Sequence, residues 1–403
     1  MNRDRRQTRY VFRPPRYSRF WAPLLVRLSD AFCLRHQYRV VETRVRSGAE
    51  SLAALHRQGH GLLLAANHSD HADPHVMLHV GRRLGVPLHF VAAREVFERN
   101  RGVNGLLLPR VGAFSIDREG ADIGAIKESI RILTEGRFPL VIFPEGEVYH
   151  LNEQLTPLND GTAAIALRAA RGLSREGNPR RVFIVPAALR YTYLDDVGGA
   201  LLHTMTRLER HILWRPQTSL TLIERVFRFG EALLGLMEME YLGYTQTGPL
   251  AERLQRFREA LIAAAETHCL GRAMAGPHPE RVRHLRGRLR AILLADPPPP
   301  PATVREVYEE LDRLFFAVQL YSYPPDYLAA NASPDRLAET LLKFEEDVFG
   351  YADIKGRRRA EVTLGKPLDV TALLDRYAAD PKECVRALTE DLARGIRGGL
   401  GPA

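Results

Sequence analysis

The chain has 403 residues, of which 45% are hydrophobic, and its formal net charge is +9 with a pI near 9.6. This length accommodates one large domain or two ordinary ones, and the positive charge favours anionic partners such as nucleic acids, phospholipid surfaces or phosphorylated substrates. Three widely separated cysteines exclude a metal-binding cysteine motif and a disulfide framework, and no apolar run approaches the roughly 20 residues of a membrane span. We therefore expect a soluble or peripheral protein of a reducing compartment, without a signal peptide.

The N-terminal segment combines a basic arm with an amphipathic pattern. Seven arginines lie within residues 1–19, and apolar side chains follow at helical spacing from Phe20 to Phe32. This combination is typical of a membrane-surface anchor, although a helix packed on the core behind a basic tail would share the pattern. We expect no nucleic-acid partner, because the sequence contains no RNP, helix-turn-helix or zinc-finger pattern.

Between residues 37 and 195 the sequence alternates between strand and helix patterns. Such alternation predicts an α/β sheet with helices on its faces. The expected strands are 37–46, 61–66, 87–92, 112–116, 138–143 and 181–189, with a further extended piece at 104–109. The expected helices are 49–58, 74–84, 120–135 and 161–171.

From about residue 195 the pattern changes to helices with charged faces, interrupted by Asp296 and the five prolines after it, a composition typical of a stiff spacer. The expected helices are 201–214, 250–270, 279–294, 303–319 and 335–348; a strand at 359–364 and a helix at 380–396 follow. No internal repeat is evident. We predict a basic arm and surface helix (1–36), an α/β core (37–195), a helical insertion (196–353) and a closing strand and helix of the core (354–403).

The stretch from Leu62 to Pro74 carries the first chemical motif. An apolar run, which indicates a buried strand, ends just before His68, and Asp73-Pro74 is a helix-start signal. Polar residues at the carboxyl end of a strand are where open α/β sheets form their sites. Asp73 and Asp70 are both close enough in sequence to orient the imidazole, and the Pro74 helix start favours Asp73. A histidine held by a carboxylate is a candidate general base for a hydroxyl group.

Three later stretches place polar or glycine residues at strand ends in the same way. Arg118 follows a short apolar run and offers a fork of donors for an anion. Glu145 follows a buried strand, and Gly146 permits a turn that a side chain would block. Pro186 within an apolar strand is typical of an edge or of a strand end beside a site.

Together these stretches resemble the four sequence blocks of the glycerolipid acyltransferases, in particular the 1-acylglycerol-3-phosphate (lysophosphatidate) branch. The resemblance covers residues 40–195, and residues 362–370 resemble the segment that closes the family's domain. Two features depart from it: Glu147 replaces the usual small hydroxyl residue, and residues 69–71 are more polar than expected. The blocks are Asn67-His68 with Asp73, Gly112-x-Phe114-x-Ile116-Asp117-Arg118, Phe143-Pro144-Glu145-Gly146 and Val185-Pro186.

The resemblance implies transfer of a fatty acyl group from a thioester, acyl-CoA or acyl-acyl-carrier protein, to the hydroxyl of a lysoglycerolipid, most simply 1-acylglycerol-3-phosphate. It implies no cofactor besides that co-substrate. The basic arm and the helix at Phe20–Phe32 would hold the protein on an anionic membrane, at its inner, cytoplasmic face. His68 would act as the base, with Asp73 orienting it, and Arg118 would bind the acceptor phosphate. The implied site residues are the catalytic His68 and Asp73 and the substrate-binding Asn67, Arg118, Glu145 and Gly146.

Two rival functions remain open at this point. A metal-dependent hydrolase would use His68, His71 and Asp73, with His75 and His79 following at helical spacing. This pattern is not His-Glu-x-x-His and no distant Cys/His cluster completes it, so we expect no metal. A lipid-binding module without catalysis is the other rival, and the intact His68 and Asp73 pair argues against it.

Overall fold

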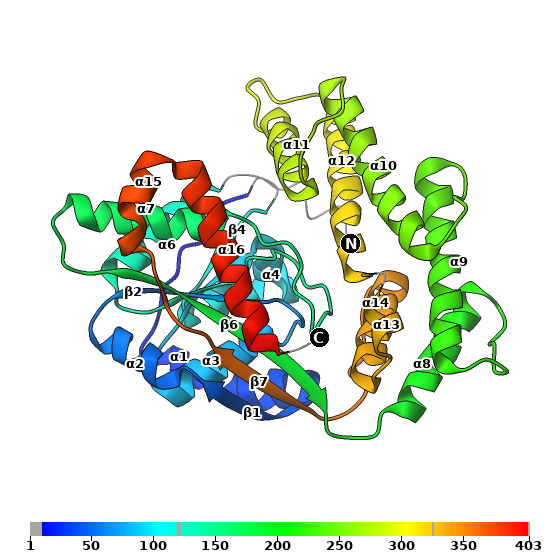
Figure 1. Ribbon diagram of the computed structural model, residues 1–403, viewed down its shortest axis with the longest axis horizontal. Helices are drawn as coiled ribbons and strands as arrows, with labels where there is room; N and C mark the ends of the chain where they lie inside the picture. The colour runs from blue at the N-terminus through cyan, green and yellow to red at the C-terminus, as the bar shows by residue number, and fades with distance from the viewer. Residues whose placement is uncertain (1–9, 119–121, 325, 402–403) are drawn as a thin grey trace. The chain divides into compact units, whose positions relative to one another are not determined.

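The computed structural model describes residues 10–118, 122–324 and 326–401. Four of the seven arginines of the predicted basic arm, those within residues 1–9, lie outside the described residues. The described chain divides into two compact units (Figure 1). One contains residues 10–118, 122–195 and 356–401, and the other contains residues 196–355.

Eight strands of the first unit's described residues form one sheet in the order β1-β7-β6-β2-β5-β3-β4, with β8 beside β6. Neighbouring strands are parallel, except where β6 meets β7 and β8. The predicted mixed sheet is therefore confirmed. The strands are β1 Val40–Ser47, β2 Gly61–Ala66, β3 His89–Ala93, β4 Ala113–Ile116, β5 Leu140–Ile142, β6 Val182–Tyr193, β7 Arg358–Leu364 and β8 Leu368–Asp369.

The central strand β2 explains why the sheet is covered on both faces. All six of its residues are buried. Leu63 and Ala65 join the hydrophobic cluster under α6 (Ile123–Glu135), α7 (Gly161–Arg175) and α16 (Pro381–Leu400). Leu62 and Leu64 join the cluster under α2 (Ala49–Arg57), α3 (Asp73–Leu84) and η2 (Ser29–Gln37). Side chains alternate between the faces of a strand, so a continuous apolar run needs a core on each side. Figure 1 shows these helices on opposite faces of the sheet.

The helices of this unit include most of the predicted ones. They are α1 Trp21–Leu28, the π-helical η2 Ser29–Gln37, α2 Ala49–Arg57, α3 Asp73–Leu84, α4 Arg94–Glu98, η3 Asn100–Gly102, α5 Val103–Leu107, η4 Leu108–Val111, α6 Ile123–Glu135, α7 Gly161–Arg175, η6 Thr371–Leu373, α15 Leu374–Ala379 and α16 Pro381–Leu400. The extended piece expected at 104–109 is wrong, because α5 and η4 occupy it. A short apolar run does not by itself distinguish a strand from a helical turn.

The described part of the basic arm lies against the sheet. The backbone N–H of Ser115 in β4 donates to the carbonyl of Arg13 at 3.1 Å, and Arg13 N–H donates to the Ser115 hydroxyl at 2.8 Å. The Tyr10 hydroxyl is also 2.8 Å from that of Ser115. Residues 10–13 are therefore part of the core unit, and α1 follows them with Ala22 and Val26 buried.

The second unit is entirely helical in its described residues. Helix α9 was not predicted, although Thr221 and Glu224 form a capping box at its start, which is a sequence signal for a helix N-terminus. No helix within residues 10–118, 122–324 and 326–401 is long and apolar enough to cross a membrane. The helices are α8 Gly198–Ile212, α9 Leu222–Leu242, α10 Leu250–Leu270, α11 His278–Leu293, α12 Pro301–Gln319, η5 Leu320–Ser322, α13 Tyr327–Ala330 and α14 Pro334–Phe349.

The connections α9–α10 and α10–α11 are built the same way, so the expectation of no internal repeat is wrong. In the first, Glu238 accepts from the backbone N–H of Gln246 at 2.9 Å and pairs with Arg253 at 2.7 Å. In the second, Glu266 accepts from Met274 at 3.1 Å and binds Arg281. Glycine and proline recur at matching places in the two turns. The pairs 28 residues apart are Glu238 and Glu266, Gly243 and Gly271, Pro249 and Pro277, and Arg253 and Arg281.

Candidate active site

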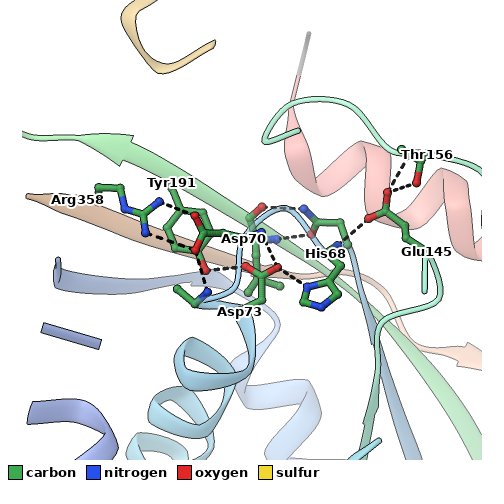
Figure 2. Close-up of polar contacts among 10 residues, drawn as sticks. His68, Asp70, Asp73, Glu145, Thr156, Tyr191 and Arg358 are labelled. Atoms are coloured by element: carbon green, nitrogen blue, oxygen red, sulfur yellow. Dashed lines mark hydrogen bonds and ion pairs between the residues drawn. The ribbon is translucent and has the colours of Figure 1, made fainter. Parts of the chain in front are cut away.

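The first polar pair joins the end of β2 to the start of α3. His68 Nδ1 is 2.9 Å from Asp73 Oδ2 (Figure 2). The imidazole stacks on the ring of Phe143, with centroids 4.2 Å apart, and the His68 side chain is 17% exposed while that of Asp73 is fully buried. Because Nδ1–H donates to the carboxylate, the lone pair of the neutral ring lies on Nε2. The geometry is that of a base oriented by a carboxylate.

Two further donors hold the Asp73 carboxylate. The Tyr191 hydroxyl donates to Oδ1 at 2.6 Å, and the backbone N–H of Asp70 donates to Oδ2 at 3.0 Å. Burial raises the pKa of Tyr191 well above its ordinary value, so the phenol stays protonated and remains a donor at neutral pH. Sequence reasoning missed Tyr191, because the predicted strand ended at residue 189 and β6 continues to Tyr193.

Asp70 does not contact the imidazole but forms an ion pair with Arg358 of β7. Arg358 Nη1 is 2.7 Å from Asp70 Oδ2, and its guanidinium lies 4.8 Å from the centroid of the Tyr191 ring. Burial favours the neutral carboxyl, but the charge and hydrogen bonds of Arg358 outweigh it and lower the pKa of Asp70 to about 2. The pair joins the His68 loop to β7. The structure thus places Asp73, and not Asp70, on the imidazole.

Asn67 pairs with the sheet instead of facing a ligand. Its side-chain oxygen accepts from the backbone N–H of Leu189 at 2.7 Å, and its side-chain nitrogen donates to the Leu189 carbonyl at 2.9 Å. The side chain is fully buried. It continues the pairing of β2 with β6 beyond the last residue of β2, so the geometry favours a structural role over the expected substrate-binding one.

Glu145 is turned into the protein and holds the backbone of His68. Its Oε1 accepts from the His68 N–H at 2.6 Å, and its Oε2 accepts from the backbone N–H of Thr156 at 2.9 Å and from the Thr156 hydroxyl. Burial raises its pKa, against the opposing effect of these hydrogen bonds. The carboxylate fixes the loop that carries the base, so its geometry fits a positioning residue better than a head-group ligand.

Arg118 and Gly146 meet at the turn after β5. Gly146 has φ +83°, and a Cβ there would lie 3.0 Å from Asn159 Nδ2, so glycine suits this turn in both conformation and space. Arg118 Nη1 donates to the Gly146 carbonyl at 3.2 Å and lies 2.7 Å from Glu147 Oε2. The arginine expected to bind an anion is therefore anchored on the loop of Glu145 and already paired with a carboxylate.

Of the histidines in the metal hypothesis, His75 and His79 turn towards η2, and the His71 ring lies 5.7 Å from that of His150. His75 Nδ1 is 2.7 Å from the Ser29 hydroxyl, and His79 Nδ1 is 3.1 Å from Asp30 Oδ2, so both side chains bind η2. Burial lowers the pKa of His75 to about 4. The packing of α3 on η2 accounts for both side chains.

The α/β unit that carries the His68–Asp73 pair resembles an acyltransferase domain. Residues 44–190 match the family model described as Acyltransferase, a range that includes the polar residues around His68 except Tyr191 and Arg358. Over 106 residues the chain is 34% identical to the 1-acyl-sn-glycerol-3-phosphate acyltransferase of Bacillus subtilis (strain 168), a stretch that is 26% of this chain and 49% of that enzyme. The chain thus spans about half the length of the curated relative it matches. These findings confirm the predicted resemblance.

Proposed function

We propose that the protein transfers a fatty acyl group from a thioester to the free hydroxyl of a lysoglycerolipid. The observation that carries this proposal is the 2.9 Å contact between His68 Nδ1 and Asp73 Oδ2 at the end of β2, within the acyltransferase domain. The name of the bacterial relative makes 1-acylglycerol-3-phosphate one acceptor to test, and acyl-CoA and acyl-acyl-carrier protein are the two donors.

The proposed reaction needs a base because an alcohol holds its proton almost as tightly as water does. His68 Nε2 removes the hydroxyl proton as the oxygen attacks the thioester carbonyl carbon. The tetrahedral intermediate then collapses, the C–S bond breaks, and the thiolate takes the proton from the imidazolium. Asp73 keeps Nδ1 protonated and stabilises the imidazolium, while Tyr191 and the backbone N–H of Asp70 keep the carboxylate in place.

The test is an assay of the purified full-length protein with both donors and a panel of lysolipids, read by mass spectrometry. We expect His68→Ala to lower kcat roughly 10²- to 10⁴-fold, which is the usual contribution of a general base. His79→Ala is the matched control, because that side chain is also 17% exposed and pairs with Asp30. An active, folded His68→Ala protein would overturn the proposal. Chelator should have no effect, and inhibition by it would favour a metal enzyme.

We also propose that α1 and η2 place the enzyme on an anionic membrane, at its cytoplasmic face. Phe20 is 76% and Phe32 is 64% exposed, and Trp21, Leu24 and Leu28 are exposed between them. Arg16, Arg19, Arg27 and Arg35 are exposed around this apolar row. An apolar row edged by arginines fits the interface between lipid tails and anionic head groups. A lysolipid acceptor would then be reached without leaving the bilayer.

A further inference from the structure

Glu147 is the residue of the site that departs most clearly from the family pattern, which has a small hydroxyl residue there. Its carboxylate lies 2.7 Å from Arg118 Nη1, and its side chain is only 12% exposed. The same guanidinium nitrogen donates to the Gly146 carbonyl. Arg118 thus pairs with Glu147 and binds the turn after β5. The same turn carries Glu145, which accepts a hydrogen bond from the His68 backbone N–H.

A second carboxylate, that of Glu95, lies near the other terminal nitrogen of Arg118. Glu95 Oε2 is 3.6 Å from Arg118 Nη2, and Glu95 Oε1 is 3.6 Å from Arg94 Nε. Arg94 Nη1 is in turn 4.0 Å from Asp117 Oδ2. Among these five described side chains, three carboxylates face two guanidinium groups. An anion that binds Arg118 must therefore approach Glu147 and Glu95 as well.

We propose that Glu147 selects the acceptor, and that this site takes a lysolipid with a zwitterionic head group in preference to a phosphate monoester. The inference rests on the proposed acyl transfer to a lysolipid. A phosphate monoester carries about −1.5 to −2 charges at pH 7, and the two carboxylates beside Arg118 repel it. A zwitterion places its anion on Arg118 and its ammonium on Glu147, so both charges of this pair keep an opposite charge beside them, and the same carboxylate that attracts this acceptor repels the monoester.

The test compares kcat/KM for three lysolipids with the same acyl chain, using the full-length protein and an acyl-CoA or acyl-carrier donor. One lysolipid is a phosphate monoester, one is an ethanolamine phosphodiester, and one has a free amino acid as its head group. We expect kcat/KM to be at least tenfold higher for one or both ammonium-bearing acceptors than for the monoester. Comparing the two ammonium-bearing acceptors shows whether Arg118 binds a phosphodiester or a carboxylate.

Glu147→Gln removes the charge with little change in shape. We expect it to reduce the preference for the ammonium-bearing acceptor at least tenfold, chiefly through KM, with Glu147→Thr giving the same shift if the first variant is unfolded. Glu153→Gln is the matched control, because Glu153 is also 12% exposed and is paired with Arg190; it should leave the preference unchanged.

Wild-type preference for the monoester, or a preference that folded Glu147 variants leave unchanged, overturns the inference alone. Acylation of no lysolipid with either donor overturns the proposed function, and the inference with it.

Discussion

Arg358 Nη1 lies 2.7 Å from Asp70 Oδ2, so a strand from the end of the chain forms a buried ion pair with the loop that holds His68. Arg358 also donates to the carbonyl of Tyr38, at 3.2 Å from Nε and 3.0 Å from Nη2. The guanidinium therefore joins β7, the loop that carries His68, and Tyr38 between η2 and β1. This accounts for the acidic residue between His68 and Asp73.

Removing one partner of this pair should destabilise the protein strongly. We expect Arg358→Met to lower the free energy of unfolding of the α/β unit by roughly 3–5 kcal/mol, because Asp70 is left buried without its partner. The Asp70→Asn/Arg358→Met double variant should recover much of that loss. Urea unfolding followed by circular dichroism measures both, with Arg357→Met as the control, since its partner Asp195 lies at the surface and its effect should be far smaller. Equal effects at 357 and 358 would contradict this assignment.

The same pair predicts an acid-sensitive stability. Asp70 has a folded pKa of about 2 against an ordinary value of 3.8, so the unfolded chain binds more protons between these values. Its contribution is fully present above about pH 4 and is lost as the pH falls towards 2, a change of about 2 kcal/mol. Urea unfolding of the wild type at several pH values tests this. The slope should be shallower in the Asp70→Asn/Arg358→Met variant, and parallel curves for the two proteins would refute it.

Tyr191 should act on catalysis only through Asp73. We expect Tyr191→Phe to lower kcat roughly tenfold with KM unchanged, because a hydrogen bond to a charged group is worth roughly 1.5–3 kcal/mol and its loss frees the carboxylate to move. The conservative control is Tyr17→Phe in the N-terminal segment, because the Tyr17 ring packs on Phe138 away from Asp73 in the sequence. Steady-state kinetics with saturating donor give the two constants. A change confined to KM would instead place the phenol in contact with the acceptor.

The repeated turns of the helical unit should depend on their buried glutamates. Glu238 is fully buried and accepts from Gln246 and Arg253, so Glu238→Gln should lower the free energy of unfolding by roughly 3 kcal/mol. Glu252→Gln is the control on the neighbouring helix, because its pair with Arg256 is exposed and should contribute less than about 0.5 kcal/mol. Thermal unfolding separates the two outcomes. Indistinguishable midpoints would show that the turn is held without the carboxylate.

The apolar row on α1 and η2 should govern vesicle binding. Replacing Phe20 and Phe32 together with serine should weaken binding to anionic vesicles roughly hundredfold, because each buried aromatic side chain contributes at least about 1.5 kcal/mol. Trp214→Ser, which removes an aromatic side chain that is 87% exposed in the helical unit, is the control. Sedimentation with vesicles of increasing anionic lipid content gives the partition constants. Unchanged binding of the double variant would exclude this surface as the anchor.

The strands and most helices could be predicted because each is encoded within a short stretch. The apolar run of β2 predicts a strand, and Asp73-Pro74 predicts the start of α3. His68 and Asp73 are so close in sequence that their contact could be expected from the spacing alone. The prediction of an extended piece at 104–109 was wrong because a few apolar residues show no periodicity that distinguishes a strand from a helix. The repeated turns of the helical unit were missed because the two copies share only scattered positions.

The site residues far from His68 in the sequence could not be predicted. Tyr191 and Arg358 are ordinary residues of two strands, and nothing in their local pattern indicates that they meet Asp73 and Asp70. Glu145 could be placed at a strand end, but not the direction of its carboxylate. That direction depends on Thr156 and on the His68 backbone, which only the folded loops bring within reach.

The sequence by itself determined the class of domain, the order of its strands and helices along the chain, and a histidine with two candidate carboxylates beside it. These follow from periodicity, helix signals and short spacing, all of which are local. The tertiary structure decided which carboxylate contacts the imidazole, that Asp70 pairs with Arg358, and that Arg118 pairs with Glu147. Each of these depends on buried charges finding partners from distant strands and loops, because a charge removed from water is stable only beside its complement.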